Sequence, residues 1–238
     1  LLKKCEFGDY HELDTIERFS NYKKVFLVDC GCNYGFYSFH TASISKKNNV
    51  ISIEASTQTS NEFLKNYKLN NFENITFLNK AISDRDNEEL HFNESENDWE
   101  SSLSHDHFNL KNVIKIKTIK IDTLLQTYKL DDYFLFIKLD IEGHEMNAIE
   151  GALSTIKNFS PIIIIEFSKY IFDDNKNINF LKKFLKNYDY HIYDTRKNKV
   201  ELDNILESVY KLTKRYKTIG NYYLIKNSSN NLKLFKND

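Results

Sequence analysis

A short apolar run that ends in an acidic residue constrains the fold of this chain more than any other feature of its sequence. Three runs end in this way: Val25 to Val28 before Asp29, Asn49 to Ile53 before Glu54, and Phe134 to Leu139 before Asp140. Val25 to Val28 is continuously apolar and the other two runs are mainly apolar, which is typical of strands buried on both faces, and helical patterns follow the first two runs. The sequence therefore predicts an α/β fold with a doubly wound, mostly parallel sheet.

Weaker patterns predict the remaining elements. Further strands are expected at 75–78, 90–92, 113–119, 162–165, 190–193 and 222–226, and further helices at 10–22, 145–159, 177–187 and 204–211. Alternating lysines predict an edge strand at 113–119, and residues 93–110, with Trp99, have no period and predict a surface loop. Thr59 and Glu62 form a capping box at the start of another helix, and Asp122 is expected to cap a short helix that runs to Tyr128.

The length of the chain favours a single domain. Its 238 residues can bury a sizeable core. We expect one domain over residues 25–227, preceded by a helical lead-in over 1–24 and followed by a polar tail over 228–238. Leu13, Ile16 and Phe19 form the apolar side of the lead-in helix.

Charge and cysteine usage limit the location and the partners. The chain has 33 Lys and Arg against 34 Asp and Glu, so it lacks the positive excess that attracts nucleic acids. No apolar stretch of about 18 residues predicts a membrane span. Cys5, Cys30 and Cys32 form no disulfide framework, which favours the cytoplasm. The start at Leu1 without a methionine leaves open that the chain is part of a longer, multidomain protein.

Glycine is scarce in this chain, so each glycine is informative. Six glycines in 238 residues are well below the usual share of roughly 7%. Gly31 and Gly35 follow the first predicted strand, where a glycine lets the backbone pass close to a ligand. Ligands of a doubly wound sheet bind at the carboxyl ends of its strands. These glycines therefore predict a cofactor loop after the first strand.

The loop favours S-adenosylmethionine over a dinucleotide. A dinucleotide loop needs G-x-G-x-x-G, whereas this loop has the spacing G-x-N-x-G. Asp29 would repel a pyrophosphate but suits the ammonium and sulfonium groups of S-adenosylmethionine, and Glu54 can accept both hydroxyls of a ribose. The predicted cofactor residues are Asp29, Gly31, Asn33, Gly35 and Glu54. Dinucleotide binding remains the alternative.

Acidic residues and a histidine follow the strand at 134–139. If the segment stays extended, Asp140, Glu142 and His144 lie on one side and face the crevice. Asp140 or His144 would then help to remove a proton from an acceptor, with Glu142 as a further catalytic candidate. The alternative is that Asp140, Glu142 and His144, together with Glu166, hold a divalent cation, with Asp140 and Glu166 as the leading ligands.

Five segments follow one another in a characteristic order: Val-Asp-Cys-Gly-Cys-Asn-Tyr-Gly at 28–35, Ile-Glu-Ala at 53–55, Asn-Lys-Ala-Ile-Ser-Asp at 79–84, Ser-Ser-Leu at 101–103 and Ile-Lys-Leu-Asp-Ile-Glu-Gly-His-Glu at 137–145. In this order they resemble the FkbM family of methyltransferases, over about residues 25 to 168. The last segment is the most specific. Cys30 and Cys32 stand where the family usually has small or valine-type residues, and we interpret them as packing residues.

The resemblance implies both a fold and an activity. The implied fold is the Rossmann-like fold of the class I methyltransferases, and Asn79 and Ala81 would join the cofactor site. The implied reaction is methylation of a hydroxyl on a saccharide or a glycosylated acceptor. A nucleic-acid ribose methyltransferase and a binding module without turnover remain alternatives, although intact Asp29, Glu54 and Asp140 favour an enzyme.

Overall fold

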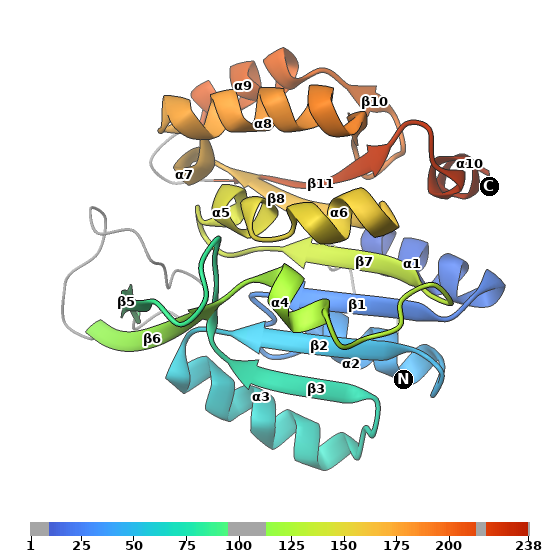
Figure 1. Ribbon diagram of the computed structural model, residues 1–238, viewed down its shortest axis with the longest axis vertical. Helices are drawn as coiled ribbons and strands as arrows, with labels where there is room; N and C mark the ends of the chain where they lie inside the picture. The colour runs from blue at the N-terminus through green and yellow to red at the C-terminus, as the bar shows by residue number, and fades with distance from the viewer. Residues whose placement is uncertain (1–9, 95–112, 213–217, 238) are drawn as a thin grey trace.

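The fold of the chain is seen in a computed structural model that describes residues 10–94, 113–212 and 218–237. Its main sheet has the strand order β10-β9-β11-β8-β7-β1-β2-β3 (Figure 1). The strands are β1 (Val25–Cys30), β2 (Asn49–Glu54), β3 (Ile75–Asn79), β7 (Phe134–Leu139), β8 (Ile162–Ser168), β9 (Tyr190–Tyr193), β10 (Lys199–Val200) and β11 (Thr218–Lys226). Most of the predicted loop at 93–110, with Trp99 and the segment 101–103, lies outside the described residues.

The predicted doubly wound, mostly parallel sheet is confirmed. Strands β3, β2, β1, β7 and β8 run parallel to one another, whereas β11 is antiparallel to both β8 and β9. The chain first builds outward from β1 through β2 to β3, and it then returns to the other side of β1 with β7. The order of the strands therefore reverses between β1 and β7, where folds of this kind bind their ligands.

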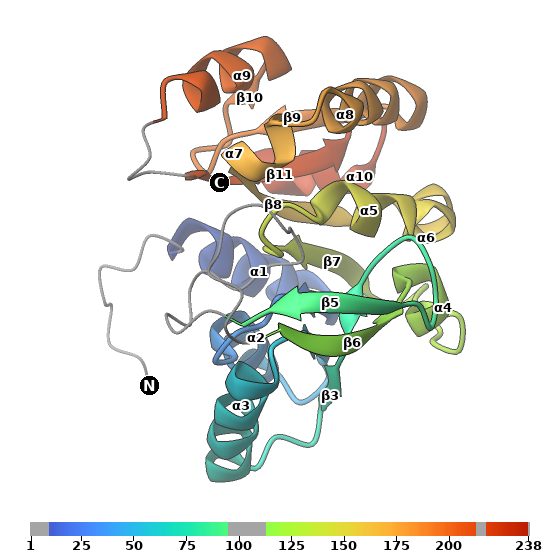
Figure 2. The same ribbon diagram turned by 90° about the vertical axis from the view of Figure 1, so that its left-hand side faces the viewer.

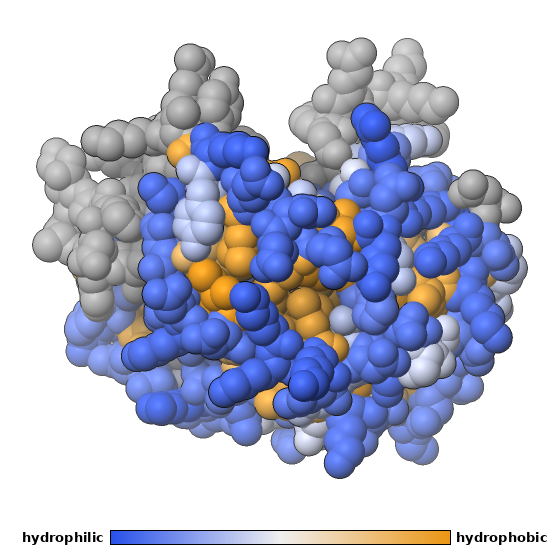
Figure 3. Space-filling model, turned by 90° about the horizontal axis from the view of Figure 1, so that it is seen from above, coloured by the Kyte–Doolittle hydropathy of each residue, from blue (hydrophilic) through white to orange (hydrophobic). Residues whose placement is uncertain are grey.

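Helices cover both faces of the sheet. One face carries α1 (Tyr10–Tyr22), α2 (Phe36–Ile44), α3 (Thr57–Asn70) and α10 (Asn230–Lys236). The other face carries α4 (Ile121–Leu125), α5 (Glu145–Glu150), α6 (Leu153–Phe159), α7 (Lys169–Phe172), α8 (Asn175–Tyr188) and α9 (Leu202–Tyr210). Successive residues of a strand point to opposite faces, so each run of apolar residues supplies both cores. Viewed from the side of α8 and α9, the molecule presents mainly hydrophilic residues, with hydrophobic ones visible between them (Figure 3).

A smaller sheet lies beside the main one. It has the order β4-β6-β5, with β4 (Ala81–Ile82), β5 (Glu89–Asn93) and β6 (Val113–Ile119). Figure 2 shows β5 and β6 in front of the carboxyl ends of the main strands. The predicted edge strand at 113–119 is therefore the middle strand of this sheet. Its lysines alternate with buried Ile116 and Thr118 because one face of the sheet meets solvent.

Two helices begin or end elsewhere than predicted. The N-cap of α3 is Ser56 and not Thr59, because the Ser56 side chain accepts a hydrogen bond from the amide of Thr59 at 3.1 Å. The single helix predicted at 145–159 is interrupted between α5 and α6. Gly151 stands at the interruption, and a Cβ there would lie 2.2 Å from the carbonyl oxygen of Ser83. The tight packing at Gly151 favours a break in the helix.

Asp122 caps a different helix from the one predicted. It lies in the first turn of α4, whose N-cap is Lys120. Its carboxylate accepts hydrogen bonds from the amides of Ser154 and Thr155, at 3.0 and 2.8 Å. These amides belong to the first turn of α6, which has no capping bond from its own N-cap side chain. Asp122 therefore ties α4 to α6.

The two ends of the chain differ in how well the sequence predicted them. The lead-in helix is confirmed as α1, with Leu13, Ile16 and Phe19 buried. The polar tail predicted over 228–238 is wrong for most of its length, because it forms α10 and buries Phe235 against two tyrosine rings. Leu232 and Phe235, three positions apart, are the buried residues of α10. Within the described parts of the chain, no helix is long and apolar enough to cross a membrane.

Candidate active site

Buried and half-buried polar residues near the carboxyl ends of four central strands lie on one face of the sheet. Residues two apart in a strand share a face, so polar positions continue the rows of apolar residues that pack against α1, α2 and α3. These positions are Asp29 in β1, Ser52 and Glu54 in β2, Lys138 in β7 and Glu166 in β8. The strand register places Asp29 opposite both Ser52 and Lys138. One face of the sheet therefore ends in a polar site.

Asp29 is buried beneath the cofactor loop. Its side chain accepts a hydrogen bond from the Ser38 hydroxyl at 2.6 Å, and Ser38 lies 2.7 Å from the Ser52 hydroxyl. Burial raises the pKa of the Asp29 carboxyl, and the nearby ammonium of Lys138 opposes this shift. Among the described residues, Asp29 Oδ1 has no hydrogen-bond partner. Buried acceptors normally have a donor, so this atom fits a donor group of a ligand.

Gly31 is required by close packing within the protein. Its φ is +75°, and a Cβ would lie 1.9 Å from the carbonyl oxygen of Asp140. The amides of Gly31 and Cys32 both donate to the carbonyl oxygen of Ile53, at 2.9 and 3.0 Å. The loop after β1 is thus hydrogen-bonded to β2 and packs closely against the residue that follows β7.

The rest of the loop turns sharply into α2. Asn33 has a φ of +48° and Gly35 a φ of +94°. A Cβ at Gly35 would lie 2.4 Å from the ring of Phe39, so this glycine also serves close packing. The side-chain oxygen of Asn33 is buried and has no partner within the described residues. It is a second acceptor in this loop that fits a donor group of a ligand.

Glu54 is held in place by backbone amides. Its two carboxylate oxygens accept hydrogen bonds from the amides of Asn33 at 3.0 Å and of Ser56 at 2.9 Å. Burial raises the pKa of Glu54 to about 7 despite these bonds. The carboxylate thus joins the loop after β1 to the turn after β2, and it stands where the sequence predicts a ribose.

Asn79 and Ala81 make different contacts: Asn79 binds the backbone of the turn after β2, and Ala81 packs in an apolar cluster. The Asn79 side-chain amide donates to the carbonyl oxygens of Glu54 and Ala55, at 2.8 and 3.1 Å. It therefore fixes the backbone next to the predicted ribose position. Ala81 is buried in a small apolar cluster with Phe92 and Ile116. Its methyl group packs within the protein, so only its backbone is left for a ligand.

Cys30 and Cys32 are packing residues, as predicted. Both are free thiols, with side chains at most 4% exposed. Burial raises the pKa of each thiol well above its ordinary value. Burial and the raised pKa both favour the neutral thiol at each position.

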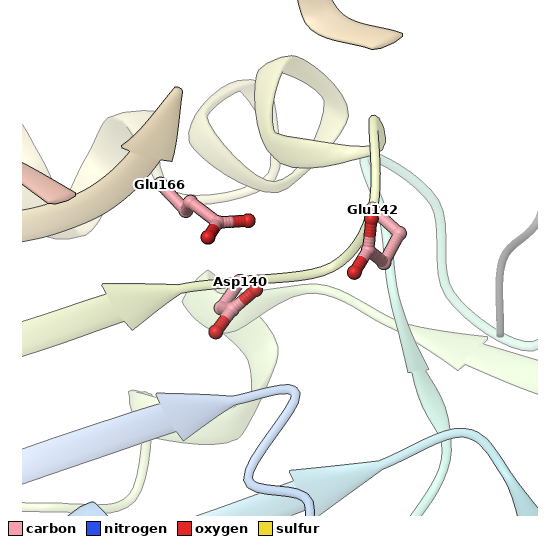
Figure 4. Close-up of side chains that lie close together, drawn as sticks. All are labelled: Asp140, Glu142 and Glu166. Atoms are coloured by element: carbon pink, nitrogen blue, oxygen red, sulfur yellow. The ribbon is translucent and has the colours of Figure 1, made fainter. Parts of the chain in front are cut away.

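Three carboxylates meet across the ends of β7 and β8. One oxygen each of Asp140, Glu142 and Glu166 lies within 4.8 Å of the others, and Figure 4 shows the three side chains pointing toward a common space. Burial raises the pKa of Glu166 to about 8, with a further contribution from Asp140. Three carboxylate oxygens at this spacing could hold a divalent cation. The structure thus brings Glu166 to the residues that follow β7.

His144 lies apart from these carboxylates, because the segment after β7 does not stay extended. Glu142 has a φ of +53° and Gly143 a φ of +104°, so the chain turns before α5. The imidazole of His144 instead lies 3.1 Å from the Ser83 hydroxyl. Burial lowers the pKa of His144 to about 4. The premise that Asp140, Glu142 and His144 share one side is therefore wrong.

Glu145 stabilises this turn and was not predicted as part of the site. Its carboxylate accepts hydrogen bonds from the amides of Ile141 at 3.0 Å and of Gly143 at 3.2 Å. Burial raises the pKa of Glu145 to about 7. Glutamate is common in the first turn of a helix, so its position alone does not indicate that Glu145 organises the site.

Lys138 is the functional candidate that the sequence prediction missed. It is only 4% exposed, although it carries a charge, and its Nζ lies 2.8 Å from Asp140 Oδ2. The same Nζ lies 4.7 Å from the centre of the Tyr37 ring. The signal was available, because a lysine inside an otherwise apolar strand is rare unless its charge is paired.

Comparison with known proteins places this site in a family. The family model described as the methyltransferase FkbM domain matches residues 29–192, which include the ends of all four strands. No curated protein sequence matches the chain.

Two solved structures share the fold. One is a methyltransferase FkbM from Methylobacillus flagellatus KT, with 20% identity, a TM-score of 0.50, and coverage of 84% of this chain and 43% of that chain. The other is a putative rRNA-methylase from Clostridium thermocellum, with 13% identity, a TM-score of 0.50, and coverage of 95% and 98%. The chain thus spans less than half of the length of the Methylobacillus flagellatus protein.

Proposed function

The chain belongs to the FkbM methyltransferase family, and from that premise we propose that it is an S-adenosylmethionine-dependent O-methyltransferase for a hydroxyl of a saccharide or a glycosylated acceptor. One observation carries the proposal. The loop after β1 touches the residue expected to receive the acceptor proton, because Gly31 packs against the backbone of Asp140 and the Asp140 amide donates to Cys30 at 3.2 Å. A methyl donor in the loop and a base at Asp140 would therefore be neighbours.

The cofactor half of the proposal rests on matching groups. Glu54 offers carboxylate oxygens for ribose hydroxyls. Asp29 and Asn33 each have a buried oxygen that lacks a partner among the described residues, and either suits the ammonium group of the cofactor. When bound, S-adenosylmethionine supplies a methyl group on a positively charged sulfur. The carboxylates of Asp29 and Glu54 attract this positive charge, whereas they would repel a pyrophosphate.

Asp140 is the proposed proton acceptor. Its side chain is 36% exposed at the end of β7, so an acceptor hydroxyl can reach it. Methyl transfer to oxygen depends on positioning, with the hydroxyl proton leaving to a nearby base as the new carbon–oxygen bond forms. Glu142 lies beside Asp140 and suits binding of other hydroxyls of the acceptor. We retain Asp140 in preference to His144, because the imidazole is turned toward Ser83.

Calorimetry with S-adenosylmethionine tests the cofactor assignment. We expect the wild type to bind and Glu54→Ala to lose at least about tenfold in affinity, since the ribose loses an acceptor. Asp140→Asn is the matched control, because it alters the other side of the site and should bind the cofactor as the wild type does. Undiminished binding by Glu54→Ala would contradict the assignment.

A screen of saccharides and glycosylated compounds tests the acceptor. We expect methyl transfer to at least one hydroxyl, and we expect Asp140→Asn to lower turnover by about a hundredfold or more, the range of general base catalysis. His144→Gln should retain turnover within a few fold. Full turnover by Asp140→Asn would remove Asp140 from the role of base.

A ribose methyltransferase acting on RNA is the second candidate. The observation in its favour is the ammonium of Lys138 beside Asp140, because a lysine can also assist removal of a proton. RNA binding that weakens steeply with salt would support this candidate over a saccharide acceptor.

A further inference from the structure

Lys138 is a buried cation within an acidic site. Its side chain is 5% exposed, and it is held between Asp140 Oδ2 at 2.8 Å and the face of the Tyr37 ring at 4.7 Å. A buried ammonium costs much more free energy than a buried methylene unless it is paired. An apolar residue would complete the strand just as well, so the charge itself requires an explanation.

The carboxylates around Lys138 come from different strands. Asp29 lies opposite Lys138 in the register of β1 and β7. Burial raises the pKa of Asp29 and of Glu166 in β8, and the ammonium of Lys138 opposes both shifts. Asp140 contacts the ammonium directly. The ammonium of Lys138 therefore interacts electrostatically with acids from β1, from the end of β7 and from β8.

A divalent ion would compete with this ammonium. Asp140 would have to ligate the ion while its Oδ2 stays bonded to Lys138 Nζ. The ion and the ammonium would then both lie next to the same carboxylate, and like charges repel strongly where water is scarce. The carboxylate spacing alone suggests a metal site, whereas the lysine beneath it already supplies the positive charge.

We propose that the ammonium of Lys138 is the resident cation of this site, which positions Asp140 and keeps a divalent metal ion away from Asp140, Glu142 and Glu166. The role in positioning rests on the proposed methyltransferase function. In that reaction the hydroxyl proton passes to the Asp140 carboxylate, the acceptor oxygen bonds to the methyl carbon, and the electron pair of the broken carbon–sulfur bond stays on sulfur. Lys138 is a positioning residue, and the reaction requires no metal ion.

Titration with Mn²⁺ alone tests the electrostatic part of the proposal without any acceptor or cofactor. At pH 8.5 we expect no binding to the wild type or to Lys138→Arg, which keeps the charge. Lys138→Met keeps a chain of similar size but removes the charge, and it should bind Mn²⁺ at least tenfold more tightly than the wild type. The double variant Lys138→Met, Asp140→Asn should lose that gain.

Two results would overturn the proposal. One is equal affinity of Lys138→Met and the wild type for Mn²⁺ when both are folded by circular dichroism. The other is Mn²⁺ binding to the wild type that Asp140→Asn abolishes, and this second result decides the matter even if Lys138→Met does not fold. Calorimetry with S-adenosylmethionine on the same wild-type sample shows separately whether the proposed function itself fails.

Turnover supplies the readout for positioning. With an active acceptor, Lys138→Met should lower kcat by more than tenfold with little change in KM, and Lys138→Arg should recover part of it. A chelator should leave wild-type turnover unchanged. Loss of turnover in the chelator, restored by Mn²⁺, would show that a metal and not Lys138 is the cation of the reaction.

Discussion

The two halves of the site neutralise their acids in different ways. The cofactor half is formed by the ends of β1 and β2 and the loop at 31–35. There, Glu54 accepts hydrogen bonds from two backbone amides, and Asp29 accepts one from a serine hydroxyl. In the acceptor half, formed by the ends of β7 and β8 and the turn at 141–144, Asp140 pairs with the Lys138 ammonium. Uncharged hydrogen-bond donors hold Glu54 and Asp29 in the cofactor half, whereas a charged ammonium group pairs with Asp140 in the acceptor half.

This difference fits the two tasks of a methyltransferase. A cofactor has a constant shape, so a cradle of backbone amides can be built in advance. A proton acceptor must stay within reach of a hydroxyl, and the Asp140 side chain is indeed more exposed than that of Asp29. The cofactor half should therefore respond to mutation mainly in stability and affinity, and the acceptor half mainly in turnover.

The largest expected effect is a loss of stability from a steric clash where the two halves touch, at Gly31 and Asp140. Gly31→Ala places a methyl group against the Asp140 carbonyl and forces a non-glycine residue to a φ of +75°. We expect a loss of stability on the order of 3 to 5 kcal/mol in urea unfolding. Gly220→Ala is the matched control, because its φ is +101° but a Cβ would meet nothing within 4 Å, and about 1 kcal/mol is expected. Equal losses would mean that the contact between the halves does not matter.

The second prediction concerns the acid that supports the acceptor half. The pKa of Glu145 is raised to about 7 in the folded protein, above the ordinary value of about 4.3. Its stabilising contribution is therefore full below about pH 4.5 and lost as the pH rises through 7. We expect the free energy of unfolding to fall from pH 5 to pH 8, and Glu145→Gln to reduce that fall by about 2 kcal/mol. An identical pH profile for wild type and variant would contradict the assignment.

The third prediction sharpens the role of the cofactor half. Because the pKa of Glu54 is about 7, its carboxylate is mostly neutral at pH 6 and mostly ionised at pH 8. If the ionised form accepts both ribose hydroxyls, affinity for S-adenosylmethionine should rise roughly tenfold over this range. Calorimetry at both pH values measures it. Glu54→Gln cannot ionise and should remove the contribution of this residue, so an unchanged slope in the variant would assign the effect to another group.

The smallest expected effect lies outside both halves. Asp122→Ala removes the cap of α6 and should cost about 1 kcal/mol of stability. Asp122→Asn should recover most of it, since asparagine is an equally good cap. Both variants should bind S-adenosylmethionine as the wild type does. A change in cofactor affinity would show that the layer of α4 and α6 reaches the site.

The cofactor half was more predictable from sequence than the acceptor half. Asp29 and Glu54 were found because each closes a local apolar run, and such runs place acids at one edge of a parallel sheet. The extended geometry that would place His144 beside Asp140 and Glu142 fails at Glu142 and Gly143, which adopt positive φ angles. A reversal of this kind is set by close packing of the turn, which local periodicity does not report.

The sequence by itself determined the alternation of strands and helices, the methyltransferase family and the acids at the strand ends, since each depends on residues close together in the chain. Only the tertiary structure decided which of them meet. It brought Glu166 to Asp140 and Glu142, it made Asp122 of α4 the cap of α6, and it paired Lys138 with Asp140. Contacts between strands depend on register and on the turns between them, and these follow from the packing of the whole molecule.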